Sequence, residues 1–177
     1  MGDKQTRMTN QTPTMTQPAA GAAVTDHRAG KYLAFHLGAE EFGLPVLSVR
    51  EIMGLQDITA VPQTPAHVRG VINLRGKVIP VVDLRLKFGL PSGEYGQRTS
   101  IIVVKVDEVM MGVIVDGVSE VLNLSSGDIE NTPDFGRGIE TPYILGMAKT
   151  KGKVRMLLDI EQILSSQDIS GFSELLQ

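Results

Sequence analysis

Short apolar runs, many of them rich in Val and Ile, recur along most of the chain and alternate with turns that contain Gly, Pro or charged residues. β-branched residues in short runs bounded by turn formers favour strands. The pattern predicts strands at Tyr32–Leu37, Glu41–Leu44, Ile58–Val61, Val71–Leu74, Lys77–Val82, Ser100–Val106, Val109–Val115, Glu120–Leu124, Ile144–Lys149 and Lys153–Leu158. Many short strands at regular spacing indicate a mainly β barrel or sandwich rather than a parallel α/β sheet.

Helical signals are few and short. Pro45 is well placed as a first helical residue, and a helix that ends at Gly54 would bring Val46, Val49 and Met53 onto one face. Such a stripe suits a binding surface or ordinary core packing. Two further helices are predicted behind capping aspartates, from Asp83 to Phe88 and over Ile160–Leu164 behind Asp159. Residues 125–141 are polar and contain Gly and Pro, which predicts a loop.

Two stretches of the chain repeat each other. Residues 70–88 and 146–164 match at an offset of 146 − 70 = 76, with identical residues at Gly70/Gly146, Gly76/Gly152, Lys77/Lys153, Val78/Val154 and Asp83/Asp159. Phe42–Ile52 also resembles Met111–Val121, at an offset of 111 − 42 = 69, and the order of the matched segments is the same in both halves. The sequence therefore predicts a duplicated β unit in a two-lobed binding scaffold. Chance similarity between Val- and Gly-rich hairpins is the alternative.

Composition narrows the class of protein. The 177 residues are 42% hydrophobic and 21% charged, the balance of an ordinary globular protein. A net charge of −3 provides no basic field for nucleic acid, and no apolar run approaches the length of a membrane span. With no Cys and no apolar signal segment, we expect a cytoplasmic protein. Residues 1–29, rich in Thr, Gln, Pro and Ala, are expected to form a disordered tail, and residues 167–177 a tail or frayed helix.

Catalytic chemistry is not apparent in the residues. The three histidines, His27, His36 and His67, lack metal-ligand spacing, and no phosphate-binding or nucleophile-elbow motif is present. We therefore expect no enzyme, no cofactor, no metal and no catalytic residue. Arg75, at the tip of an apolar hairpin, is either a solvated turn residue or a docking contact, with Glu51 as its natural partner by charge.

Several blocks of the chain resemble the chemotaxis coupling-protein (CheW) family. They are YLAFHLGAEEFGL (Tyr32–Leu44), VREI (Val49–Ile52), TPAHVRGVINLRGKVIPVVDLR (Thr64–Arg85), VDGVSEV (Val115–Val121) and the closing ILGMAKTKGKVRMLLDIEQIL. The resemblance implies a mainly β fold of two SH3-like five-stranded barrels around a shared hydrophobic core, with short helices and a C-terminal helix. The domain would cover residues 30–166, in approximate halves 30–94 and 95–166. In that family the first strand can join the lobe built mainly from the second half.

The resemblance also implies a function. The family has no enzymatic activity and joins the chemotaxis histidine kinase, through a kinase regulatory domain of the same fold, to the cytoplasmic tips of membrane chemoreceptors in ring-containing arrays. The residues that match its receptor-binding positions are Val46, Val49, Glu51, Arg75 and Gly76. Kinase-binding residues are not assigned. Two alternatives stay open: a same-fold adaptor for twitching motility or second-messenger control, and a small-ligand enzyme or sensor that uses the interlobe groove.

Overall fold

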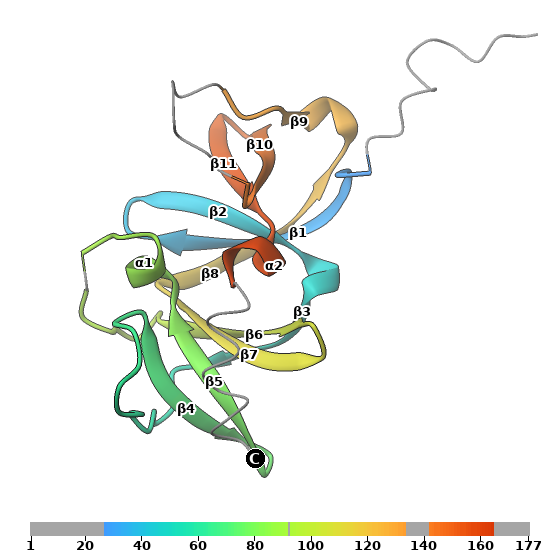
Figure 1. Cartoon of the computed structure of the whole chain (residues 1–177). Helices are drawn as coiled ribbons and strands as arrows, with labels where there is room; N and C mark the ends of the chain where they lie inside the picture. Colours follow the sequence, from blue (N-terminus) through green and yellow to red (C-terminus); the bar gives the residue numbers. More distant parts are fainter. Residues whose placement is uncertain (1–26, 92, 134–141, 165–177) are drawn as a thin grey trace, which may run out of the picture.

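Two β-sheets form the framework of the computed structural model, which describes residues 27–91, 93–133 and 142–164 (Figure 1). The six-stranded sheet has the order β8-β1-β2-β11-β10-β9, and the five-stranded sheet the order β3-β6-β7-β5-β4. The strands are β1 (Gly30–Leu37), β2 (Glu40–Pro45), β3 (Val49–Gly54), β4 (Val68–Leu74), β5 (Lys77–Asp83), β6 (Ser100–Val106), β7 (Val109–Val115), β8 (Gly117–Leu124), β9 (Ile129–Glu130), β10 (Ile144–Thr150) and β11 (Lys153–Leu158). The predicted mainly β class is confirmed.

The helical elements are short. They are two 3₁₀ turns, η1 (Val46–Ser48) and η2 (Ser126–Asp128), and two single-turn helices, α1 (Leu84–Lys87) and α2 (Ile160–Ile163). Both predicted caps are confirmed. The Asp83 carboxylate accepts a hydrogen bond from the backbone N–H of Arg85 at 2.9 Å, and the Asp159 carboxylate accepts one from the backbone N–H of Glu161 at 3.1 Å. Each cap satisfies a backbone donor that the helix itself leaves unpaired.

The repeat reappears in the topology, but with its first hairpins exchanged. Shifted by 69 or 76 residues, β1, β2, β3, β4 and β5 correspond to β6, β7, β8, β10 and β11. The β1–β2 hairpin nevertheless pairs with β8 and β11, whereas β6–β7 pairs with β3 and β5. Even the parallel registers correspond, since Leu157 lies opposite Gly43 and Val81 opposite Gly112. Each sheet therefore combines a hairpin from one half with strands from the other, and the approximate division at 94/95 does not separate the sheets.

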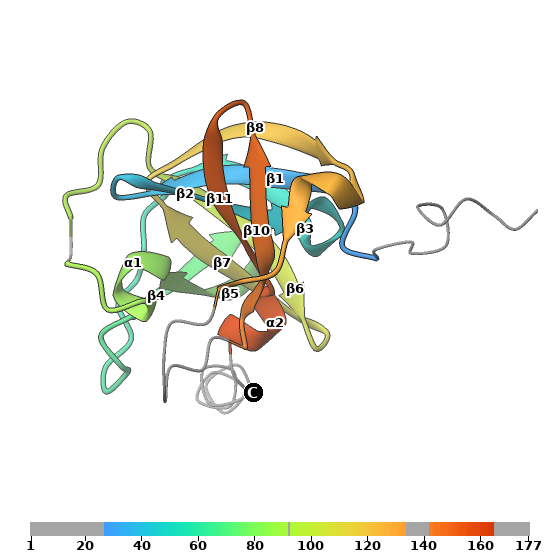
Figure 2. The ribbon, with the colours of Figure 1, turned by 90° about the horizontal axis from the view of Figure 1, so that it is seen from above.

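The apolar interior has three parts. The largest cluster draws on both sheets, with Phe35 and Leu44 from one and Ile102 and Val113 from the other, and it forms the core that the lobes share. Two smaller clusters fill the individual barrels, one around Tyr32, Leu122 and Leu157 and one around Ile72, Ile79 and Ile101. We call the five-stranded unit the first barrel and the six-stranded unit the second barrel. Seen from above, the β10–β11 hairpin crosses the direction of strands β8, β1 and β2 (Figure 2).

The segment after Pro45 corrects the predicted helix. Only Val46–Ser48 turns, as a 3₁₀ element, and Val49–Gly54 is strand β3, paired antiparallel with β6. In β3, partly buried residues alternate with exposed ones, which is the period-two pattern of a strand. Three apolar residues over such a short segment fit either this pattern or one face of a helix, so their spacing alone did not separate the two. Tertiary pairing with β6 decides the conformation.

Two other segments also differ from expectation. The predicted strand Ile58–Val61 is wrong, because only Thr59 forms an isolated bridge, to Val71. The loop predicted over 125–141 contains η2 and β9. Within the predicted tail, Arg28 donates to the carbonyl oxygen of Leu145 at 3.0 Å. Residues 1–26 and the predicted C-terminal tail or frayed helix at 167–177 lie outside the described residues.

Candidate functional site

The predicted pair of Glu51 and Arg75 is present. Arg75 Nη2 lies 2.7 Å from Glu51 Oε1, with the arginine side chain 75% exposed. Arg75 and Gly76 have φ values of 52° and 84°, and the Gly76 N–H donates to the Asn73 side chain at 2.8 Å, which shapes the hairpin tip. The tip is thus held against strand β3, and not against a helix. Exposed ion pairs contribute about 0–1 kcal/mol to folding, so this pair is a minor contributor to stability.

The barrel that carries this ion pair also has partly exposed apolar side chains. Met53 from β3, Leu74 from β4 and Met110 from β7 are partly exposed and pack against the apolar cluster inside the first barrel. Methionine is flexible and polarisable, which suits a surface that adapts to another molecule. We call the end of the barrel formed by Glu51, Met53, Leu74, Arg75, Lys77 and Met110 the first mouth.

The other predicted receptor-binding residues lie along the same edge. Val49 precedes Glu51 on β3, and both Val46 and Val49 pack partly buried against the shared core. Val46 also lines a groove of about 630 Å³ together with Leu47 of η1 and Ile144 of β10. The structure therefore brings Glu51 and Arg75 into contact, while Val46 lines the groove and Val49 packs against the shared core. Leu47, which is 90% exposed, was not predicted, although an apolar residue directly after Pro45-Val46 was the available signal.

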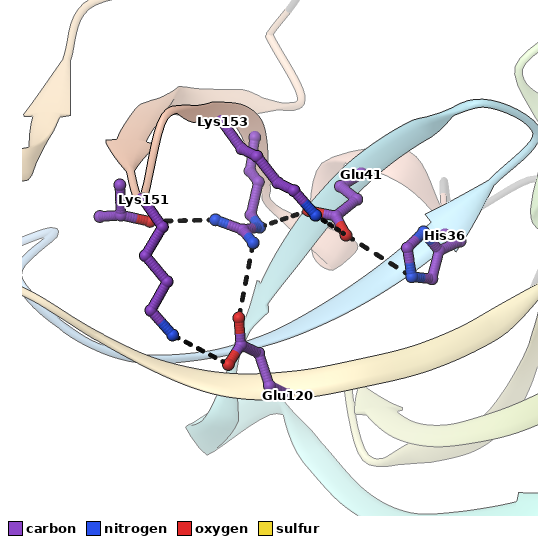
Figure 3. A network of polar contacts seen from close by, with 7 residues as sticks. His36, Glu41, Glu120, Lys151 and Lys153 are labelled. Atoms are coloured by element: carbon purple, nitrogen blue, oxygen red, sulfur yellow. Dashed lines mark hydrogen bonds and ion pairs between the residues drawn. The ribbon is translucent and has the colours of Figure 1, made fainter.

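The repeat places a second ion pair at the equivalent end of the second barrel. Lys151 and Glu120, the counterparts of Arg75 and Glu51, lie 3.2 Å apart (Figure 3). Lys151 and Gly152 have φ values of 53° and 73°, so both tips have the same turn conformation. We call the end formed by Glu41, Glu120, Thr150, Lys151, Lys153 and Arg155 the second mouth.

A buried ion pair lies inside the second mouth. Arg155, on β11, is only 2% exposed, and its Nε lies 2.6 Å from Glu41 Oε2. The Nε–H is not aligned with that oxygen, so the contact is an ion pair rather than a hydrogen bond. Arg155 also donates to the Thr150 hydroxyl at 3.0 Å and approaches Glu120 at 3.5 Å. Lys153, at 3.7 Å, and His36, at 3.5 Å, both face Glu41 (Figure 3). None of these contacts was predicted, because they join distant strands.

A third polar cluster ties the loop before β6 to the first barrel. The Tyr95 hydroxyl donates to Asp83 at 2.7 Å and accepts from Arg69 Nε at 2.7 Å. Burial, followed by the hydrogen bond to Asp83, raises the pKa of Tyr95 above its ordinary value. Asp83 also caps α1, so this cluster has a structural role.

Among the described residues, the remaining titratable groups do not gather into a reaction centre. His27 lines the groove beside Val46, His36 faces Glu41, and the carbonyl of His67 accepts from Asp83 N–H, so the histidines lie apart. Within the three described ranges, no group of His, Asp and Glu side chains is placed to hold a metal ion. No helix in the described part of the chain is long and apolar enough to cross a membrane.

Two barrels that share a core, with an ion pair and apolar side chains exposed at a barrel end, define a protein-binding scaffold. The family described as CheW-like domain matches residues 31–168. Chemotaxis protein CheW of Klebsiella aerogenes is 37% identical over 156 residues, covering 85% of this chain and 94% of the relative. Chemotaxis protein CheW of Rhizobium meliloti is 37% identical over 136 residues, covering 77% of this chain and 88% of the relative. The crystal structure of scaffolding protein TtCheW from Thermoanaerobacter tengcongensis has a TM-score of 0.71 at 34% identity, covering 79% of this chain and 95% of that one.

The chain therefore belongs to the CheW family. It is a non-catalytic chemotaxis scaffold that couples chemoreceptors to the CheA kinase. The resemblance stated from the sequence blocks is confirmed, and the small-ligand enzyme is no longer an alternative.

Proposed function

We propose that the first mouth and the adjoining groove bind the cytoplasmic tip of a membrane chemoreceptor through Val46, Val49, Glu51, Arg75 and Gly76. The regulatory domain of the histidine kinase binds elsewhere on the chain, so that both partners are held at once in rings within receptor arrays. The protein acts in the cytoplasm, recruited to membrane receptor arrays by its partners, and it neither binds nucleic acid nor inserts directly into the membrane.

The observation that carries the proposal is the exposed Glu51–Arg75 pair beside partly exposed apolar side chains. An amphipathic helix buries an apolar stripe in a groove and places polar side chains at its rim. Met53 and Met110 supply apolar surface, while Arg75 supplies a planar cation with several donors. Because the ion pair contributes little to folding, its fixed geometry is better explained by binding than by stability.

The test uses the full chain, a chemoreceptor cytoplasmic fragment and the kinase regulatory domain. We expect Arg75→Ala to weaken receptor binding about tenfold or more, since a central arginine is a common energetic anchor, and to leave kinase binding unchanged. Lys151→Ala is the matched control, because Lys151 is the counterpart of Arg75 in the repeat, and it should retain receptor binding.

A double-mutant cycle of Glu51→Gln and Arg75→Ala tests whether the two side chains act as a unit. Coupled effects on receptor affinity support the proposal, whereas fully additive effects contradict it. A wild-type chain that binds neither partner would refute the proposed surfaces altogether. An adaptor for a non-flagellar receptor–kinase pathway would use the same surfaces, and capture of its kinase from that pathway would identify it.

A further inference from the structure

The two mouths are repeat-related surfaces with different chemistry. Their tips agree, with Glu51–Arg75 at one end and Glu120–Lys151 at the other. Exposed apolar side chains also recur, at Ile52 and Val121 on the outer strands and at Val78 and Val154 beside the tips. A partner that recognised only these features would meet two sites on each chain.

The difference lies at the positions directly inside the tips. Ile79, buried just inside the first mouth, corresponds to Arg155 of the second mouth, Met110 corresponds to Glu41, and Leu74 corresponds to Thr150. The parallel pairing explains why these residues are neighbours, because Val81 lies opposite Gly112 as Leu157 lies opposite Gly43, two residues further along each strand. The first mouth is therefore apolar where the second contains a buried ion pair.

Because of this difference, two equivalent lysines differ in whether a carboxylate lies close to the ammonium group. Lys153 at the second mouth has the Glu41 carboxylate within 3.7 Å. Lys77 is its counterpart at the first mouth, where Met110 takes the position of Glu41. Lys77 is exposed, and no carboxylate among the described residues lies within 4.0 Å of its ammonium group. The first mouth thus offers an apolar surface with an unneutralised cation at its rim, whereas the second offers neither.

We infer that Lys77 is a specificity-determining contact that directs the helical partner to the first mouth. The inference rests on the proposed function, and it adds the chemistry of the ligand: a helix with an apolar side chain that covers Met53 and Met110 and, at its flank, a carboxylate that pairs with Lys77. The second mouth does not suit this helix. There Glu41 already pairs with Lys153, and the Glu41–Arg155 ion pair stands where the first mouth has apolar side chains.

The experiment measures the affinity of the full chain for a chemoreceptor cytoplasmic-tip fragment at low and high salt. We expect Lys77→Gln to weaken binding about fivefold at low salt and to reduce the dependence of affinity on salt, because an attraction between opposite charges has been removed. Lys77→Glu should weaken binding further. Lys153→Gln is the matched control and should bind as the wild type does.

A third variant tests the role of the equivalent acid. Met110→Glu places a carboxylate beside Lys77, as Glu41 stands beside Lys153, and should reproduce the loss seen with Lys77→Gln. Thermal unfolding verifies that each variant is folded, and the two Lys77 variants decide the question if Met110→Glu does not fold.

The outcomes separate this inference from the proposed function. If Arg75→Ala loses the receptor fragment but Lys77→Gln retains full affinity and salt dependence, the inference is overturned and the proposed receptor surface stands. Equal losses for Lys77→Gln and Lys153→Gln would also overturn it, because general electrostatic attraction would then account for both. If the wild type binds no receptor fragment, the proposed function fails and the inference fails with it.

Discussion

The buried Arg155–Glu41 pair permits a quantitative test of how the second barrel is stabilised. Replacing Glu41 with Met, the residue at the equivalent position of the first barrel, leaves the Arg155 guanidinium 2% exposed, with Glu120 at 3.5 Å as its nearest remaining carboxylate. Breaking a buried pair by removing one partner costs about 3–5 kcal/mol. Because Glu120 compensates in part, we expect a loss of about 3 kcal/mol, a large fraction of the roughly 5–15 kcal/mol that stabilises a domain.

The complementary substitutions should behave differently. Arg155→Ile leaves Glu41, whose side chain is 11% exposed, near Lys153 and His36, so the loss should be smaller, about 1–2 kcal/mol. The double variant Glu41→Met/Arg155→Ile removes both charges and reproduces the first-barrel residues. Replacing a whole buried pair with apolar side chains is often neutral or stabilising, so we expect a stability within about 1 kcal/mol of the wild type or above it.

Urea unfolding of the four chains measures these differences. With a denaturant slope of about 1–3 kcal/mol/M, Glu41→Met should lower the unfolding midpoint by about 1–3 M at an unchanged slope. Lys149→Met is the control, because its pair with Glu130 at 2.9 Å is exposed on both sides and should be worth less than about 1 kcal/mol. A double variant as unstable as Glu41→Met alone, or a Glu41→Met chain as stable as the wild type, would refute the reasoning.

Two further predictions concern the first barrel. Burial raises the folded-state pKa of Tyr95 above its unfolded value of 10.0, so its contribution to stability is complete below about pH 10 and is lost as the pH rises further. Urea midpoints should therefore fall less steeply above pH 10 in Tyr95→Phe than in the wild type; equal slopes would contradict this. Gly70→Ala would place a Cβ 2.0 Å from the Thr59 carbonyl oxygen at a φ of 141°, whereas Gly54→Ala meets nothing within 4 Å. Thermal unfolding should show a loss of more than about 3 kcal/mol for Gly70→Ala and about 1 kcal/mol or less for Gly54→Ala, and similar losses would contradict the assigned contact.

Much of the local structure follows from short-range signals in the sequence. The hairpins around Arg75-Gly76 and Lys151-Gly152 form because a turn with positive φ separates two apolar runs, and the capping aspartates begin α1 and α2. The repeat was visible as identical residues at constant spacing, and the family blocks indicated the shared core. Charge alone suggested Glu51 as the partner of Arg75.

Tertiary structure decided which strands pair with which. The β1–β2 and β6–β7 hairpins have similar apolar patterns, so nothing local indicates that each joins the strands of the other half. Residues Val49–Gly54 become a strand because β6 pairs with them, although their apolar spacing also fits a helix. The contrast between Lys77 and Lys153 likewise depends on which residue the exchanged hairpin places beside each lysine: Met110 beside the first, Glu41 beside the second. The sequence by itself therefore determined most of the strands, the hairpin turns, the helix caps and the duplication. Long-range pairing decided the conformation of Val49–Gly54 and the chemistry of the two mouths, because the residues involved are distant along the chain.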